Sequence, residues 1–321
     1  MSMSILSEIK CNGLVPVMKF ANAADAVSVC QAVSRGGLNV AEITFRTEAA
    51  EEAIRNVCAA LPDMIVGAGT VTTIDQAQRA KQAGARFVVM PGFNPKVVSW
   101  CIAHDLLAIP GINDPSGIEA AMELGLTCLK FFPAEASGGV KFLKAVRAPY
   151  ANITFMPTGG VNEDNLVEYL ATPGVVACGG SWMVPADAVA SGDYAAIESL
   201  VRRAVYKMLN FRLAHVGVNT GSAENALSTA ALFTRLFGFE SKEGNSSVMS
   251  ASAVELMKGE GRGTNGHIGI ATTSVERAVY FLERAGFSFD PQSKKCAPNG
   301  ALKAIYFTDE IAGFAMHLVQ G

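Results

Sequence analysis

The chain has 321 residues, of which 50% are hydrophobic and 17% are charged, and its formal net charge is −3. These values are typical of compact globular domains and exclude a disordered chain. The chain contains no basic tract, so we expect no nucleic-acid partner, although a local phosphate site is compatible with this charge.

The length favours one barrel-sized domain followed by a smaller one. The seven cysteines are scattered and contain no CxxC pair. This distribution indicates reduced thiols in a cytoplasmic protein rather than a disulfide framework or a zinc ribbon. The N-terminus has no apolar signal-like region and no segment is long enough to span a membrane, so we expect no membrane partner.

Residues 1–12 are expected to form a short leading helix. From residue 14 to residue 208 the chain then alternates short apolar runs with amphipathic stretches. Each apolar run has the composition of a strand that is buried on both faces. The runs lie near residues 14–18, 38–44, 64–68, 86–90, 107–109, 127–131, 153–157 and 175–178.

Eight strands alternating with helices predict an α/β domain, a closed (β/α)8 TIM barrel. A doubly wound open sheet is the alternative fold for the same pattern. In a barrel, functional side chains gather at the carboxyl ends of the strands, so these ends are the places to look for chemistry.

The second apolar run ends in "AEITFRT". Because side chains alternate along a strand, Glu42 and Thr44 share one face and Arg46 extends it. Glu42 is a candidate proton shuttle, and Arg46 is a candidate for binding a carboxylate. The alternative is a structural pair of Glu42 with Arg46.

Two further strand ends carry weaker signals. The third run ends in "GAGT", where Thr70 offers a hydroxyl to a carboxylate, although a plain turn explains this segment equally well. The fourth run ends in "VMPGF", where Pro91 would form a rigid wall.

Lys130 is the most informative residue of the chain. It lies in "TCLKFFPAEASGG", between Leu129 and Phe131. A buried, unpaired ammonium is costly, so a lysine in such a place tends to lose its proton. A neutral lysine is a nucleophile that forms a Schiff base with a carbonyl substrate. The alternative is a surface lysine at a strand end.

The last two apolar runs end in glycine-rich turns, "PTGG" and "CGGSW". Glycine-rich turns at these two positions of a barrel expose backbone N–H groups that can bind a phosphate. Simple tight turns are the alternative. The candidate phosphate-binding residues are Gly159, Gly160, Gly179, Gly180 and Ser181.

The pattern changes at Phe211, after the helical segment "DYAAIESLVRRAVYKMLN". Two similar segments follow, one beginning "FRLAHVGVNTGS" and the other "TNGHIGIATTS", and each continues into a helix ending in Gly-Phe. This internal repeat predicts an α+β domain made of paired βαβββ units. We therefore expect domains at 1–210 and 211–321, packed together without a long linker.

Three histidines occur in the second domain. His215 and His267 occupy equivalent places in the two repeats, while Glu255 and His317 lie on late strands. Four ligand-type residues at such positions predict a site for a divalent ion such as Zn²⁺, Mn²⁺, Ni²⁺ or Fe²⁺. The alternative is that the histidines are core residues of a structural or oligomerising module.

Residues 5–208 resemble the bacterial 2-keto-3-deoxy-6-phosphogluconate (KDPG) / 4-hydroxy-2-oxoglutarate (KHG) aldolase family. The segments that carry the resemblance are "VPV", "EITFRTEAA", "VGAGTV", "MPGFNP", "IPGI", "LKFFPAEASGGVKFLKA", "PTGGV" and "GGSWMVP". A departure occurs in "INDPSGIEA", where Gly117 stands at a position that relatives often fill with Glu.

The resemblance implies a class I aldolase that needs no cofactor, acts on a small molecule and forms a homotrimer. It implies Lys130 as the Schiff-base lysine and Glu42 as the acid/base. Arg46, Thr70 and Thr158 would contact the pyruvyl end of the substrate, with Pro91 and Phe132 lining the pocket. The glycine-rich turns would hold the substrate's phosphate.

Residues 211–321 resemble the vicinal oxygen chelate superfamily, which includes glyoxalases and extradiol dioxygenases. In that superfamily the metal ligands come from the same four strand positions, and the last is often Glu, so His317 is a departure. The resemblance implies a metal site made of His215, Glu255, His267 and His317.

The whole chain is therefore expected to cleave KDPG to pyruvate and glyceraldehyde 3-phosphate, and KHG to pyruvate and glyoxylate. One alternative is a bifunctional protein whose metal domain acts on an oxo compound. Others are an aldolase specific for the phosphogalactonate analogue and a barrel that only binds a sugar phosphate, against which the pairing of Lys130 with Glu42 argues.

Overall fold

The computed structural model describes residues 3–321 and contains two compact units. The N-terminal unit ends at Met208 and the C-terminal unit comprises Leu209–Gly321. Within the described residues, no helix combines the length and apolar character needed to cross a bilayer.

The strands of the N-terminal unit pair in parallel throughout. One sheet has the order β5-β4-β3-β2-β1-β9 and the other has the order β6-β7-β8. Their bounds are β1 Leu14–Met18, β2 Val40–Thr44, β3 Ile65–Gly69, β4 Phe87–Val89, β5 Leu107–Ile109, β6 Gly111–Ile112, β7 Cys128–Phe131, β8 Thr154–Pro157 and β9 Cys178–Gly180.

The two sheets continue into one another. Strands β5 and β6 are consecutive pieces of one extended segment that is interrupted only at Pro110, whose carbonyl accepts a hydrogen bond from the Lys130 N–H at 2.9 Å. At the other edge, isolated parallel bridges join Phe155 to Val175 and Thr158 to Gly179, next to β9. The arrangement is TIM-barrel-like, as predicted, and does not match the doubly wound alternative.

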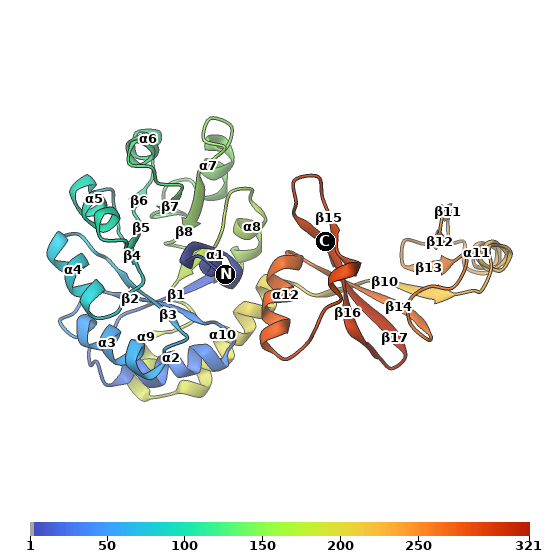
Figure 1. Cartoon of the computed structure of the whole chain (residues 1–321), viewed down its shortest axis with the longest axis horizontal. Coiled ribbons are helices and arrows are strands. Elements are labelled where there is room, and N and C mark those ends of the chain that lie inside the picture. Colours follow the sequence, from blue (N-terminus) through green and yellow to red (C-terminus); the bar gives the residue numbers. More distant parts are fainter. Residues whose placement is uncertain (1–2) are drawn as a thin grey trace. The chain divides into compact units, whose positions relative to one another are not determined.

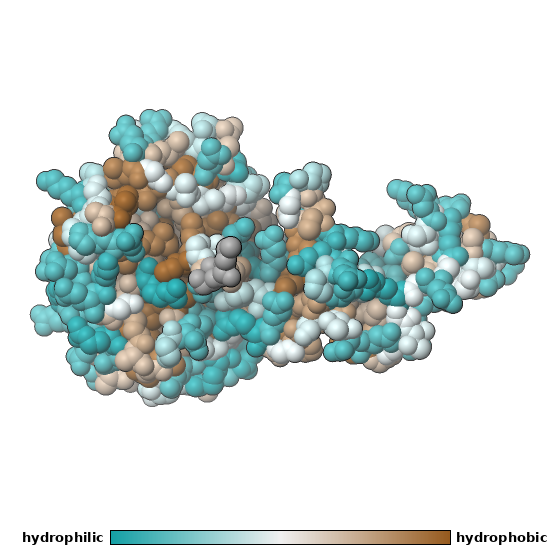
Figure 2. Space-filling view, in the orientation of Figure 1, coloured by the Kyte–Doolittle hydropathy of each residue, from teal (hydrophilic) through white to brown (hydrophobic). Residues whose placement is uncertain are grey.

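Helices surround these strands (Figure 1). They are α1 Ile5–Asn12, α2 Asp25–Arg35, α3 Ala50–Ala60, α4 Ile74–Gln82, α5 Pro95–Ala103, α6 Pro115–Glu123, α7 Gly139–Val146, α8 Leu166–Ala171, α9 Ala186–Ser191 and α10 Tyr194–Leu209. Several begin at side-chain caps, such as Thr73, whose hydroxyl accepts from the Gln76 N–H, and Asp114, which accepts from the Gly117 N–H. Figure 2 shows mainly hydrophilic residues on the outside of this unit and hydrophobic residues deeper between its helices.

The core of the N-terminal unit is made by inward-facing strand residues such as Val15, Val40 and Ile65, and by Ile9 of α1. Packing in this core is so tight that position 67 has room only for glycine. A Cβ at Gly67 would lie 2.3 Å from the ring of Phe87, so the phenyl ring occupies the space that a side chain would need.

The C-terminal unit contains one mixed sheet of order β11-β12-β13-β10-β14-β17-β16-β15. The first half is β10 Arg212–Asn219, α11 Ala223–Phe237, β11 Ser241–Glu243, β12 Ser247–Ser250 and β13 Val254–Met257. The second half is β14 Gly266–Thr272, α12 Val275–Arg284, the 3-10 turn η1 Pro291–Ser293, β15 Lys295–Cys296, β16 Leu302–Ile311 and β17 Phe314–Gln320. The two halves meet at the antiparallel pair β10–β14 and have the same order of elements.

Candidate active site and candidate metal centre

A pocket of about 290 Å³ opens at the carboxyl ends of the strands of the N-terminal unit. It brings together all of the predicted barrel site residues except Gly179. Three apolar or neutral residues join them without having been predicted as site residues. The lining residues are Val17, Glu42, Thr44, Arg46, Thr70, Pro91, Lys130, Phe132, Thr158, Gly159, Gly160, Val161, Gly180 and Ser181.

Lys130 lies on β7 and is only 5% exposed, so it is not a surface lysine. Its strand neighbours Leu129 and Phe131 are fully buried. The Nζ atom lies 4.6 Å from the centre of the Phe132 ring, on the pocket wall. The amine is therefore largely removed from water and accessible from the pocket, as nucleophilic chemistry requires.

Glu42 lies on β2 and is 1% exposed. Burial raises the pKa of its carboxyl group, while the positive charges of Lys130 and Arg46 act in the opposite direction. Its Oε2 atom has no hydrogen-bond partner among the described residues. A Cβ at Gly69 would lie 2.1 Å from Glu42 Oε1, so the glycine provides the room for this carboxylate.

Arg46 is oriented by a neighbour on the same strand end. Its Nε donates to Thr44 Oγ1 at 3.2 Å, and the Thr44 hydroxyl donates to the Met18 carbonyl at 2.9 Å. Among the described residues no carboxylate forms an ion pair with Arg46, so the alternative of a structural pair with Glu42 does not hold. The alternation of side chains in the sequence predicted that Thr44 shares a face with Glu42. It did not predict the hydrogen bond between Thr44 and the guanidinium of Arg46.

The threonines of the pocket occupy unusual positions. Thr70, directly after β3, has a φ of 58°, a left-handed conformation that is uncommon for a threonine and that clusters at functional sites. The hydroxyl of Thr158 is buried and has no partner in the described part of the chain. The Thr158 hydroxyl is therefore available to a ligand, and Thr70 lines the same pocket.

Gly179 lies behind Thr158 rather than on the pocket wall. A Cβ at this position would lie 2.4 Å from Thr158 Oγ1. The glycine thus makes room for the threonine, which the sequence pattern did not reveal because Thr158 and Gly179 meet only through a bridge between β8 and β9.

The glycine-rich turns leave main-chain donors free. Gly159 and Gly160 have φ values of 93° and 85°, which favour glycine. Among the described residues outside regular helices and strands, the N–H groups of Gly160 and Ser181 donate to no other main-chain group. Donors of this kind at the end of β8 and β9 suit an anion.

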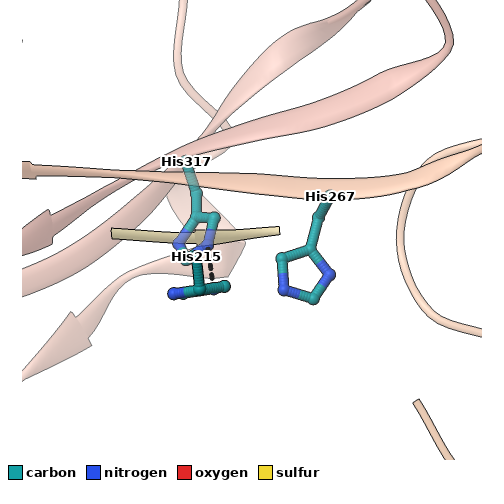
Figure 3. Close-up of side chains that lie close together, drawn as sticks. All are labelled: His215, His267 and His317. Carbon is teal, nitrogen blue, oxygen red and sulfur yellow. Dashed lines mark hydrogen bonds between the residues drawn. The ribbon is translucent and has the colours of Figure 1, made fainter. Parts of the chain in front are cut away.

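In the C-terminal unit, the four predicted ligands lie on four adjacent strands. His215 is on β10, Glu255 on β13, His267 on β14 and His317 on β17. One ring nitrogen of each histidine lies within 4.8 Å of those of the other two. Figure 3 shows the three rings converging, with a hydrogen bond between His215 and His317.

Strand register explains why these side chains fit together. His215 lies opposite Gly269, and His267 lies opposite Gly217. A Cβ at Gly217 would lie 2.0 Å from the His267 ring, and one at Gly269 would lie 2.6 Å from the His215 ring. Each repeat therefore supplies a histidine and, two residues later, the glycine that makes room for the other repeat's histidine.

Three of the four groups in the cluster favour their unprotonated forms. Hydrogen bonds from His267 and from the Ser247 hydroxyl lower the pKa of Glu255 to about 2. Burial, helped by the neighbouring imidazoles, lowers the pKa of His317 to about 3, and burial also lowers the pKa of His215. These are the protonation states that metal binding requires.

Three of the donor separations are close to those expected for ligands of a single ion. His267 Nε2 and Glu255 Oε2 are 3.0 Å apart, His317 Nε2 and His215 Nε2 are 3.1 Å apart, and His215 Nε2 and Glu255 Oε2 are 3.5 Å apart. Ligands that each lie about 2.0–2.1 Å from one ion are separated by roughly 2.9–3.4 Å. On the far side of its ring, His317 Nδ1 is buried without a partner among the described residues.

Comparison with known proteins points to the N-terminal unit. A family model described as KDPG and KHG aldolase matches residues 5–200. The 2-dehydro-3-deoxy-phosphogluconate aldolase of Treponema pallidum (strain Nichols) is 48% identical over 187 residues, which cover 58% of this chain and 89% of that protein. The KHG/KDPG aldolase of Escherichia coli (strain K12) is 43% identical over 192 residues, which cover 60% of this chain and 90% of that protein.

A solved structure agrees with these sequence matches. It is a KDPG aldolase from Legionella pneumophila, with pyruvate captured at low pH as a covalent carbinolamine intermediate. Its sequence identity with this chain is 34% and the TM-score is 0.60, with 61% of this chain and 96% of that chain covered.

Proposed function

The chain belongs to the KDPG and KHG aldolase family, and on that premise we propose that its N-terminal unit is a class I aldolase that cleaves KDPG to pyruvate and glyceraldehyde 3-phosphate. It also cleaves KHG to pyruvate and glyoxylate. The observation that carries this proposal is the nearly buried Lys130 in one pocket with the buried carboxyl group of Glu42.

Schiff-base formation is the first step. The unprotonated Nζ of Lys130 attacks the C2 ketone of the substrate, and loss of water gives an iminium ion. Glu42 supplies and removes the protons that this dehydration needs, because burial raises the pKa of its carboxyl group and so makes the neutral, proton-donating form more accessible.

Carbon–carbon cleavage follows. Glu42, directly or through water, takes the proton of the C4 hydroxyl as the C3–C4 bond breaks. The electron pair of that bond moves toward the iminium nitrogen, which leaves an enamine on Lys130 and releases the aldehyde. Protonation of the enamine at C3 and hydrolysis then free pyruvate and restore the lysine. A class I aldolase of this kind needs no cofactor.

The remaining pocket residues bind and orient the substrate. Arg46, Thr70 and Thr158 hold the pyruvyl end, since they supply one guanidinium and two hydroxyl groups. Pro91 and Phe132 form the apolar walls. Gly159, Gly160, Gly180 and Ser181 hold the phosphate through main-chain N–H groups and a hydroxyl, and Gly179 supports Thr158 from behind.

The phosphate loops favour a phosphorylated substrate over KHG, and they are equally compatible with the phosphogalactonate analogue. Steady-state assays of the full chain on all three compounds test the proposal. We expect the highest kcat/KM with a phosphorylated compound. Absence of cleavage of all three would contradict it and leave the barrel as a sugar-phosphate binding domain.

We further infer that the two parallel sheets form one closed (β/α)8 barrel and that residues 1–210 act as a homotrimeric domain, as the family resemblance implies. Strands β5 and β6 and the bridges beside β9 support the closure. Sedimentation analysis of the full chain tests the trimer.

A second candidate function belongs to residues 211–321. We infer that this unit is a vicinal oxygen chelate domain in which His215, Glu255, His267 and His317 hold a divalent ion such as Zn²⁺, Mn²⁺, Ni²⁺ or Fe²⁺. The proximity of the three imidazoles to one another, and of Glu255 Oε2 to two of them, supports this inference. When bound, the ion would supply Lewis acidity toward an oxygen of an oxo compound. With one carboxylate and three imidazoles, the site would have a net charge of about +1 and would polarise that oxygen more strongly than a site with two carboxylates.

A further inference from the structure

A carboxylate lies directly against the loop that we propose binds phosphate. Glu135 follows β7, and its N–H donates to the Gly159 carbonyl at 3.1 Å. A Cβ at Gly160 would lie 2.4 Å from Glu135 Cγ, so the stem of this side chain packs on the glycine itself. A negative charge this close to a bound phosphate would repel it.

The structure holds this charge away from the pocket. Tyr169 of α8 donates its hydroxyl to Glu135 Oε1. The same oxygen lies 3.2 Å from where a Cβ of Gly139 would be, at the first residue of α7. Glu135 is accordingly not among the residues that line the pocket. Its carboxylate faces the beginning of a helix, where a negative charge is favoured.

Tyr169 is well suited to hold the carboxylate permanently. It is fully buried, and burial together with the hydrogen bond to Glu135 raises its pKa well above the usual value for a tyrosine. The phenol therefore keeps its proton, and remains a donor, at every pH at which an enzyme of this kind operates.

We propose that Tyr169 is a positioning residue that anchors the Glu135 carboxylate against α7 and so protects the phosphate site from its charge. The proposal rests on the assignment of the 159–160 and 180–181 turns to phosphate. It makes Tyr169 a determinant of specificity for phosphorylated over unphosphorylated substrates, although it touches neither.

The test uses Tyr169→Phe in the full chain, which removes one oxygen and keeps the ring. Freed from its anchor, the carboxylate reaches toward the phosphate, and KM for KDPG rises about threefold to tenfold. The KM for KHG stays within twofold, because that substrate has no phosphate, and kcat stays within twofold for both.

The double variant Tyr169→Phe/Glu135→Gln separates charge from structure. It restores the KM for KDPG to within twofold of the original, since the freed side chain is then neutral. Glu135→Gln alone leaves that KM unchanged or lower. Equal increases of KM for both substrates, failure of the double variant to restore KM, or an increase with Glu135→Gln alone would each overturn the proposal.

Tyr150→Phe is the matched control, because the Tyr150 hydroxyl also donates to a glutamate, Glu119, at 2.9 Å, but at an exposed place. It should change neither KM, and selective loss of KDPG affinity in this variant would also overturn the proposal. Ser181→Asp separates the two levels of inference. If Ser181→Asp raises KM for KDPG selectively and Tyr169→Phe does not, only the positioning role fails. If neither variant is selective, the phosphate assignment fails with it.

Discussion

In the N-terminal unit, Lys130 and Glu42 lie on different strands of one barrel-like fold, and each belongs to a sequence segment that is informative alone. In the C-terminal unit, no single segment is informative, and the four candidate ligands acquire meaning only when the two repeats are compared. A site built around one reactive side chain can be recognised from the short sequence segment that surrounds that residue. A site built from several ligand residues can be recognised only when distant segments of the sequence are compared.

The two sites also differ in how their buried charge is balanced. Burial raises the pKa of Glu42, but the guanidinium of Arg46 acts in the opposite direction, so the protein itself supplies a positive charge near this carboxylate. Glu255 faces imidazoles, of which two have lowered pKa values and stay neutral near pH 7. The barrel carboxylate thus has a permanently charged partner in Arg46, whereas Glu255 lies among imidazoles, two of them neutral, and a divalent ion would add positive charge there.

The largest effect is expected from substitution of the proposed acid/base residue of the barrel site, Glu42. Glu42→Gln keeps the shape of the side chain and removes its ability to exchange a proton. We expect kcat for KDPG cleavage to fall by about 10²–10⁴-fold, while Lys130 still binds pyruvate. Glu119→Gln, at an exposed position, is the control and should be neutral. Nearly normal turnover of Glu42→Gln would show that this carboxylate is only structural.

The next effect concerns metal removal, which is expected to affect the C-terminal unit but not the aldolase activity of the N-terminal unit. The purified full chain should carry about one divalent ion, and removal by EDTA should destabilise the C-terminal unit by about 4 kcal/mol if the free ion was held at a thousandfold excess over Kd. Calorimetry with and without EDTA measures this. Aldolase activity should persist, because the iminium supplies the electrophile.

Substitution distinguishes the cluster from adventitious binding. His317→Ala should lower the metal content measured by mass spectrometry, whereas His104→Ala should not, because His104 lies exposed after α5 and stacks on Trp100. A metal content near zero in protein purified with added Zn²⁺ or Mn²⁺ would favour a structural role for the histidines.

Ser181→Asp should have a smaller effect, confined to phosphate binding. A like charge at the phosphate loop should raise KM for KDPG by about tenfold or more, with little change for KHG. Steady-state kinetics with both substrates measure the ratio. Equal changes of KM for the two compounds would contradict the assignment of the phosphate site to this end of the pocket.

The smallest effect is a shift of pH dependence in the barrel. Arg46 lowers the pKa of Glu42, so Arg46→Met should raise it. Because cleavage requires the carboxylate form, the acid limb of the kcat profile at saturating substrate should move to higher pH. A shift to lower pH, or none, would show that Glu42 is not the group that titrates.

Much of the barrel was predictable because burial and alternation act locally. Apolar flanks around Lys130 and the period of two through Glu42 and Arg46 are properties of short segments. The break between β5 and β6 at Pro110, in contrast, and the position of Gly179 behind Thr158 depend on pairing between strands that are distant in the sequence.

The same limit applies elsewhere. The positions of the four candidate C-terminal ligands could be compared through the repeat, but the roles of Gly217 and Gly269 follow from the antiparallel register of β10 with β14. The contact of Tyr169 with Glu135 joins α8 to the segment after β7, and no local pattern indicates it.

Borohydride trapping tests the central claim most directly. The full chain is incubated with pyruvate, reduced with borohydride, digested and mapped by mass spectrometry. The proposed mechanism predicts one reduced pyruvyl adduct per chain, at Lys130, and none in Lys130→Met. An adduct at another lysine, or no adduct at all, would contradict the Schiff-base assignment.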